Sequence, residues 1–206
     1  MPSQKSIPSA LAREPKRLRG KRRVEALLDA AAWAFGEKGY DGATMTEIAA
    51  RADTAIGSLY QFFPSKEALA DALLTRYGER LEAGLQQIES RAAALGPAGL
   101  AAALVDLMLE LRGDRASAIA LLEARDVAGV SRAALRQMML RQLSASLLAA
   151  GPAIGVARAQ TMSFVLLHAM KAIPRLAAEG EAAGTDVVGE VRSMIRLYIV
   201  HALGKP

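Results

Sequence analysis

Apolar residues recur at helical spacing along most of the chain. Counted from Val24, they fall at offsets of 3, 4, 7 and 11 residues up to Phe35, which places them on one face of a helix that ends at Gly39. A second series, from Leu69 to Ile88, repeats close to every 3.6 residues. It predicts a long helix over about residues 66–93.

Two short helices are predicted between these long ones. Thr44 and Glu47 stand in the positions of a capping box, in which a threonine hydroxyl accepts from a free amide and a glutamate at the third helical position reaches back. Apolar residues then support a helix from Met45 to about Ala52. The next helix, over residues 56–62, has to end before Pro64, because proline disfavours helical geometry in the residue that precedes it.

The remainder of the chain also has the pattern of helices. Gly96, Pro97 and Gly99 indicate a linker. Beyond it, helices are predicted at about 98–112, 114–125, 131–149, 156–178 and 187–203. Their expected breaks are Gly113, Gly129, Gly151-Pro152 and residues 179–184, and Pro174 is expected to kink its helix or end it one turn early. The predicted fold is all-α, with about nine helices in all.

A spaced set of motifs spans the first part of the chain. It runs from Gly39-Tyr40-Asp41 through Ile48-Ala49 and Gly57-Ser58-Leu59-Tyr60 to Phe62-Phe63 and Ser65-Lys66-Glu67-Ala68-Leu69. Over about residues 22–70 this set resembles the N-terminal domain of the TetR family of transcriptional regulators. The resemblance implies a DNA-binding helix-turn-helix domain at 21–66, after a basic disordered arm at 1–20. It also implies a helical regulatory and dimerisation domain at 67–206, joined to the first by a long helix.

The second short helix is expected to enter the major groove of DNA. Gly57 has no side chain and allows close approach, Ile56 can touch a thymine methyl, and Gln61 offers an amide to a base edge. Family resemblance assigns Tyr60 and Lys66 to phosphates, together with Thr44, which also caps a helix. Leu59, Phe62 and Phe63 are expected to point into the core. The full predicted contact set is Arg19, Lys21, Thr44, Thr54, Ala55, Ile56, Gly57, Ser58, Tyr60, Gln61 and Lys66.

The turn between the short helices departs from the family pattern. The family usually has glycine in this turn and a serine or threonine cap, whereas this chain has Asp53 and Ala55. Thr54 is an alternative cap that would shift the helix start by one residue. An acid at Asp53 would also weakly repel DNA.

Charge is concentrated at the N-terminus. Residues 1–23 contain eight basic side chains and one acidic side chain, whereas the whole chain has a net charge of +5. Such a segment, containing three prolines, is typical of a disordered arm attracted to phosphate; a solubilising leader is the alternative. A second hypothesis for the whole protein is therefore a helical interaction module whose arm binds nucleic acid without sequence preference.

Other classes of protein find little support in the sequence. The chain has no cysteine and only two histidines, and it lacks the nucleophile, phosphate-loop and zinc motifs of common enzymes. We therefore expect a protein that is not an enzyme and has no cofactor or metal. The charged N-terminus is unlike a signal peptide, and no long uncharged apolar segment is evident. A cytoplasmic location without a membrane partner is expected.

Family resemblance further implies a small-molecule effector and a homodimer. The helices at 156–178 and 187–203 have more apolar residues than one buried stripe needs. This favours a second copy of the chain that covers the remaining apolar surface. A symmetric dimer would bind a near-palindromic operator in double-stranded DNA. The walls of an effector pocket would be rich in Leu, Met and Ala, so the effector is expected to be mainly apolar. The predicted pocket residues are Met108, Glu123, Met139, Phe164 and His168, of which the methionines and the histidine have core packing as the competing role.

Overall fold

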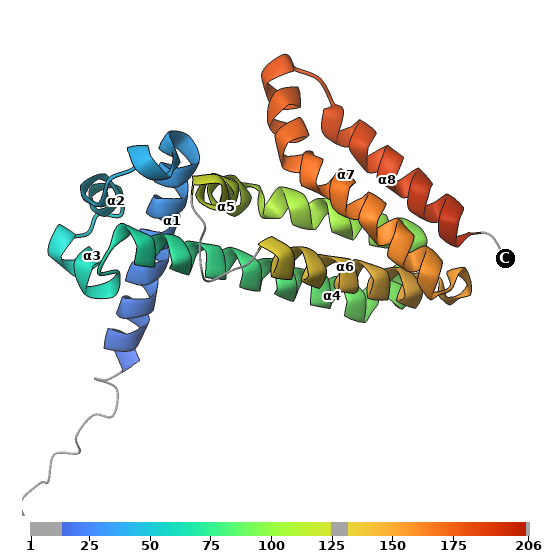
Figure 1. The fold of residues 1–206 in the computed structure, drawn as a ribbon, viewed down its shortest axis with the longest axis horizontal. Coiled ribbons are helices and arrows are strands. Elements are labelled where there is room, and N and C mark those ends of the chain that lie inside the picture. The colour runs from blue at the N-terminus through green and yellow to red at the C-terminus, as the bar shows by residue number, and fades with distance from the viewer. Residues whose placement is uncertain (1–13, 125–131, 205–206) are drawn as a thin grey trace, which may run out of the picture.

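Helical periodicity in the sequence corresponds to helices in the computed structural model, which describes residues 14–124 and 132–204. Over these residues the elements are α1 Glu14–Gly42, α2 Met45–Arg51, α3 Ile56–Phe62, α4 Lys66–Glu110, α5 Arg112–Ala124, α6 Arg132–Ala150, the 3-10 helix η2 Pro152–Ile154, α7 Val156–Ala183 and α8 Val187–Leu203. The predicted all-α fold is confirmed. Helices α1 to α3 lie at one end of the molecule, α6 to α8 lie toward the other, and α4 connects them (Figure 1).

The first helix begins earlier than the sequence predicted. Residues 14–20 are helical, so this part of the expected disordered arm is wrong, and residues 1–13 lie outside the described residues. Pro15 is compatible with the helix because the first-turn amides have no partner inside a helix. At the other end, Gly39 has φ 70° and ψ 175°, a conformation that favours glycine. It ends the regular helix where the sequence predicted.

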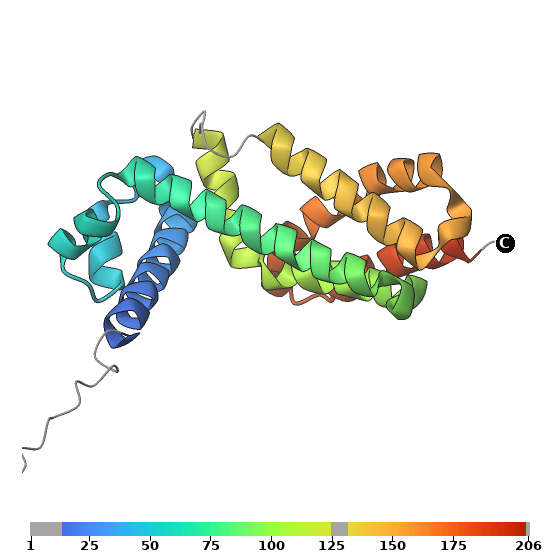
Figure 2. The same cartoon turned by 90° about the horizontal axis from the view of Figure 1, so that it is seen from below.

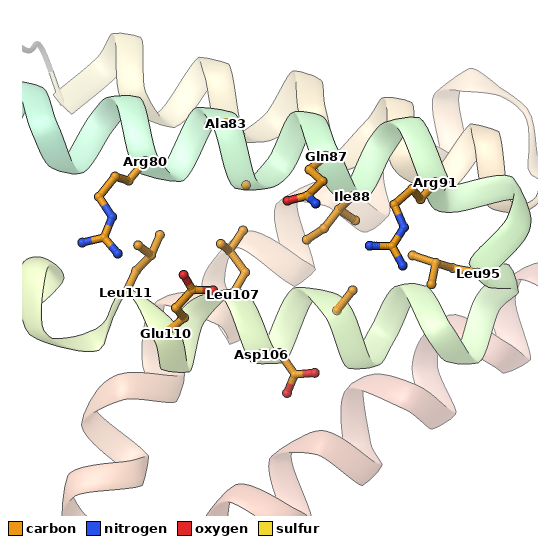
Figure 3. A pocket seen from close by; sticks show the side chains of 12 residues that line it. Arg80, Ala83, Gln87, Ile88, Arg91, Leu95, Asp106, Leu107, Glu110 and Leu111 are labelled. Carbon is orange, nitrogen blue, oxygen red and sulfur yellow. The ribbon is translucent and has the colours of Figure 1, made fainter.

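Helix α4 consists of two arms that fold back on each other. Gly96 has φ 62° and ψ −179°, and the arms on either side of it run antiparallel (Figures 2 and 3). Gly84 lies against Leu107 so closely that a Cβ atom would clash with it. The predicted linker at residues 96–99 is therefore a tight reversal. Counted as two helices, the arms bring the described part of the chain to the nine helices that the sequence predicted.

Breaks in the C-terminal half differ in detail from the prediction. Gly113 lies inside the first turn of α5, and α7 continues past Pro174 to end at Gly184 in the left-handed conformation, with φ 66°. Pro174 therefore does not end the helix early, although α7 changes direction in its second half (Figure 1). The break predicted at Gly129 lies outside the described residues.

Among the described residues, α4 has the length and apolar composition of a membrane-spanning helix. Its second arm, however, contributes Leu100, Leu104 and Met108 to the interior, where each is at most 1% exposed. Burial of this kind is typical of the core helix of a folded domain. The apolar character of α4 is therefore explained by packing.

An ionic cluster joins α1, α4 and α5. Arg76 on α4 donates to Asp29 on α1 at 2.8 Å and to Asp114 on α5 at 2.9 Å, and Arg80 also pairs with Asp114. The side chains of Arg76 and Asp114 are only 12% and 10% exposed, so water screens their interaction weakly. Helix α5 also packs directly against α1. These contacts couple the position of α5 to the N-terminal helices.

Candidate nucleic-acid interface and ligand pocket

The start of α2 is capped as its sequence predicts. The Thr44 hydroxyl accepts from the Glu47 amide at 3.2 Å. The Glu47 carboxylate, which was expected to reach back to the cap, instead pairs with Lys38 at 2.6 Å. Only the first half of the capping box is therefore formed, and the glutamate joins α1 to α2.

The turn after α2 explains how this chain tolerates an aspartate in place of glycine. The Asp53 amide bonds to the Ala50 carbonyl at 3.1 Å and the Thr54 amide to the Ala49 carbonyl at 3.0 Å. These two bonds form a Schellman motif, which needs a left-handed residue at Asp53. Asp53 has φ 47°, and aspartate enters this region more readily than most residues.

Thr54 does not cap α3. Its hydroxyl donates to the Ala52 carbonyl at 3.0 Å, while Ala55 occupies the N-cap position without a side-chain hydrogen bond. The predicted alternative start of the helix is therefore wrong. Helix α3 begins at Ile56 with its first amides free of a side-chain cap.

We expect Asp53→Gly to stabilise the protein. Glycine takes the left-handed conformation without the steric cost that an L-residue carries, which amounts to about 1 kcal/mol. For a chain of this size the melting temperature should rise by about 2 to 4 °C in a thermal melt. Asp53→Asn is the control, because it removes the charge and keeps an amide that tolerates the same conformation. A gain as large in Asp53→Asn would assign the effect to charge instead of backbone strain.

One face of α3 is open to solvent. Ile56 and Tyr60 are 40% and 49% exposed, whereas Leu59 is fully buried. Gly57 and Gln61 are also exposed. Residues of the predicted DNA-facing set on this helix therefore share an accessible face, separate from the residue that anchors the helix to the core.

The two adjacent phenylalanines divide between surface and core. Phe62 is 39% exposed and Phe63 is 7% exposed, so the expectation that Phe62 points inward is wrong. The helix ends at Phe62, and Phe63 has the extended values φ −132° and ψ 98°. Helical periodicity no longer applies after this change, and the Phe63 ring occupies the core.

The basic N-terminal part of α1 lies beside α3. Arg23 donates to the Ser58 hydroxyl at 3.5 Å, and Arg19, Lys21 and Arg22 are exposed. The sequence prediction included Arg19 and Lys21 but missed Arg23. Its spacing from Arg19 is four residues, which places both on one helical face, but the prolines favoured a disordered arm over a helix.

Lys66 has a structural role that the sequence did not predict. Its ammonium donates to the carbonyls of Tyr40 at 2.8 Å, Ala43 at 3.0 Å and Asp41 at 3.4 Å. An ammonium has three donors, so the acceptors at the end of α1 use all of them. Its predicted ammonium contact with phosphate is therefore not available in this arrangement, whereas the N-terminal amides of α4 stay candidates for an anion.

Two adjoining hollows lie among α4, α5, α6 and α7. Their volumes are about 230 and 450 Å³, and Arg115, Ile119 and Lys171 line both of them. The other residues around the smaller hollow are Tyr77, Ala118, Leu122, Leu135, Arg136 and Met139. Together the hollows have the size of a small-molecule site.

Predicted pocket residues are only partly brought together. Met139 lines the smaller hollow, but Met108 is 1% exposed within the core. Phe164 is 46% exposed on the surface of α7, and His168 is exposed beside it. The Glu123 side chain lies outside the described residues. Phe164, His168 and Met108 therefore do not line these hollows.

A third hollow, of about 460 Å³, separates the two arms of α4. Arg80, Gln87 and Arg91 on the first arm point toward the second arm, where the Glu110 carboxylate points toward them and the Asp106 carboxylate points away (Figure 3). Asp106 also pairs with Arg192 on α8 at 2.7 Å. Side chains of both charge signs therefore line this hollow.

Helices α7 and α8 expose an apolar surface. Phe164 and Val165 on α7 are 46% and 49% exposed, and Met194 and Leu197 on α8 are 54% and 69% exposed. Met194 and Leu197 are three residues apart and share one face of α8, whereas Phe164 and Val165 are consecutive on α7. An exposed apolar surface of this kind is typical of a protein contact.

Comparison with known proteins finds a family match in the N-terminal region. Residues 27–73 match the family described as bacterial regulatory proteins, tetR family. The chain is 41% identical over 75 residues to the HTH-type transcriptional repressor KstR of Mycolicibacterium smegmatis, covering 36% of this chain and 35% of the relative. It is 37% identical over 67 residues to the A-factor receptor protein of Streptomyces griseus, covering 32% and 24%. The matched segment thus spans about a third or less of the curated relatives' length.

Solved structures extend the likeness in fold to most of the chain. A TetR-like transcriptional regulator from Rhodococcus sp. RHA1 has a TM-score of 0.60 at 20% identity, covering 89% of this chain and 97% of that structure. The transcriptional regulator FadR from Bacillus subtilis in complex with stearoyl-CoA has a TM-score of 0.56 at 19% identity, covering 85% and 97%. At these identities the likeness concerns the fold alone.

Proposed function

We propose that the whole protein is a sequence-specific transcriptional repressor released from DNA by a small molecule, since its residues 27–73 match the tetR family of bacterial regulatory proteins. The observation that carries the proposal is the exposed face of α3, where Ile56, Gly57, Tyr60 and Gln61 are accessible while Leu59 anchors the helix. A short helix presented in this way suits the major groove.

Contacts to bases and contacts to phosphates are assigned to different residues. Ile56, Gly57 and Gln61 lie toward base edges, with Thr54, Ala55 and Ser58 beside them. Tyr60 and Thr44 bind phosphates, and the α4 N-terminal amides at Lys66 supply a further phosphate site. Arg19 and Lys21 add charge from α1, and Arg23 joins them through its contact with Ser58.

The same proposal includes a homodimer and a cytoplasmic location. Two copies joined through the exposed faces of α7 and α8 present two α3 helices to a near-palindromic operator. The effector occupies the adjoining hollows beside α5. Its binding displaces α5, and the Arg76 cluster passes this displacement to α1, so that operator affinity falls.

Binding-site selection from a random DNA pool tests the base-contact assignment. The wild-type protein should enrich one near-palindromic sequence, and Gln61→Ala should relax the preference at one base position in each half-site by about 1 to 3 kcal/mol. Tyr60→Phe should weaken binding to every sequence alike, because a phosphate contact does not distinguish bases. An unchanged selection profile for Gln61→Ala would remove Gln61 from the base-contact set.

The same selection experiment distinguishes a specific repressor from the alternative function, a module that binds nucleic acid without sequence preference. Such a module would enrich no sequence, and all fragments would dissociate together as salt rises. A specific repressor should still shift its selected fragment in the presence of excess competitor DNA. Loss of that shift would favour the alternative.

A further inference from the structure

A buried arginine that donates to neutral acceptors among the described residues lies at the wall shared by the two hollows. Arg115 is 9% exposed, and its guanidinium donates to the Lys171 carbonyl at 3.0 Å and to the Tyr77 hydroxyl at 3.4 Å. Both acceptors are neutral. Removing a charge from water is costly, and buried charges are normally paired with an opposite charge.

Two further cations line the same smaller hollow. Arg136 on α6 and Lys171 on α7 surround it together with Arg115. Burial lowers the pKa of Lys171, and the positive charges of Arg136 and Arg115 lower it further. The three cations therefore repel one another.

Neighbouring arginines differ from this cluster in having acidic partners. Arg112 and Arg175 line the larger hollow. Arg112 pairs with Glu181 at 3.1 Å, and Arg175 pairs with Glu179 at 2.7 Å. Among the side chains that the structure describes, which do not include those of Glu123 and residues 125–131, no carboxylate forms an ion pair with Arg115, Arg136 or Lys171. The missing negative charge is thus specific to the hollow.

The rest of the hollow is apolar. Ala118, Ile119 and Leu122 from α5 and Leu135 and Met139 from α6 complete its lining. A ligand that fits this lining needs an apolar body as well as a group that neutralises the cations. A mainly apolar effector, as the sequence predicted, would leave three like charges uncompensated.

We propose that the hollow binds an organic anion with an apolar body, whose carboxylate lies among Arg115, Arg136 and Lys171 and whose body lies against Ile119, Leu122, Leu135 and Met139. The assignment deepens the proposed function, because it rests on the hollow being the effector site. It replaces the mainly apolar effector by an amphiphilic anion. Arginine suits this role because its planar group can donate two parallel hydrogen bonds to a carboxylate.

Calorimetric titration of the full-length protein without DNA tests the charge requirement. The ligands are hexanoate, decanoate and tetradecanoate, each compared with the primary alcohol of the same length at concentrations below micelle formation. In at least one pair the carboxylate should bind about tenfold or more tightly than its alcohol, because charge-assisted hydrogen bonds exceed neutral ones. Equal affinity in all three pairs, or no carboxylate binding at all, would overturn the proposal.

Charge-neutralising variants locate the site. Arg136→Gln and Lys171→Gln should each weaken binding of the tightest carboxylate by about tenfold, with little change for its alcohol. Arg141→Gln is the matched control, since Arg141 is exposed on α6 and lines neither hollow. Equal loss in the control would mean non-specific attraction by the net positive surface, against the proposal.

A thermal melt without ligand shows whether the Lys171→Gln variant is folded. Because Lys171 is repelled by Arg136 and Arg115, Lys171→Gln should melt no lower than the wild type, whereas a structural lysine would lower the melting temperature when replaced. A clear fall in the melting temperature would show that Lys171 stabilises the ligand-free fold, and would contradict the proposal that the three cations form an anion site.

Failure of this inference is distinguishable from failure of the proposed function. Carboxylate binding that leaves the affinity for the selected DNA unchanged would keep the anion site and remove the release mechanism. Release of DNA by neutral molecules only, together with absent carboxylate binding, would keep the repressor and remove the anion site.

Discussion

A Gly57→Leu variant is expected to fold normally and to lose operator binding. Gly57 is exposed inside α3, and a Cβ atom built there meets nothing within 4 Å. Leucine also has a higher helix propensity than glycine, by about 0.8 kcal/mol. In the proposed complex, however, the leucine side chain fills the space between α3 and the base edges. The affinity for the selected DNA should fall by about 100-fold or more.

Two measurements separate these effects. The melting temperature should hold or rise, and fluorescence anisotropy with labelled DNA should report the lost affinity. Gly78→Leu is the matched control, because Gly78 is also helical, has nothing within 4 Å of its Cβ position, and lies on α4 outside the α3 face. If Gly57→Leu bound DNA as the wild type does, the exposed face of α3 would not be the groove-facing surface.

The second large effect is expected from Leu197→Arg. Leu197 is 69% exposed at the centre of the apolar surface of α8, so the folded protomer tolerates a charge there. In the proposed dimer the same position is buried, and an unpaired buried charge is strongly unfavourable. The dimer dissociation constant should rise by about 100-fold or more, and DNA affinity should fall with it at low protein concentration.

Sedimentation at several protein concentrations measures the change in mass. Gln86→Arg adds the same charge at an exposed position of α4, which is not part of the proposed interface on α7 and α8, and should stay dimeric. A wild-type protein that is a monomer at every concentration would remove the dimer from the proposal. A Leu197→Arg variant that stays dimeric would move the interface away from this face.

Local signals were sufficient to predict most of the helices, including the two short helices α2 and α3. The Thr44 cap, the break at Gly39 and the end of α3 before Pro64 depend on residues within a few positions of one another. The different exposure of Phe62 and Phe63 was not predicted, because the backbone changes from helical to extended between them and helical periodicity no longer applies. The structural role of Lys66 was not predicted because its acceptors are the carbonyls at the end of α1, more than twenty residues away.

The proposed ligand site was the part of the structure that the sequence predicted least well. Arg115, Arg136 and Lys171 come from three helices, and nothing in their spacing along the chain indicates that they meet. Met108 and His168 attracted notice as unusual residues in apolar runs, but only the packing of the helices shows that one is buried and the other exposed. Pocket composition thus depends on tertiary structure.

Two adjacent residues on α5 contact different parts of the molecule. Arg115 lines the proposed effector site, while Asp114 holds Arg76 and, through it, Asp29 on α1. One helix cannot reposition the first residue without moving the second. Thermodynamic linkage then makes the effect reciprocal. If a bound anion lowers the affinity for the operator by some factor, bound operator lowers the affinity for the anion by the same factor. A cell in which most copies occupy DNA would therefore respond only at higher effector concentrations than the isolated protein does.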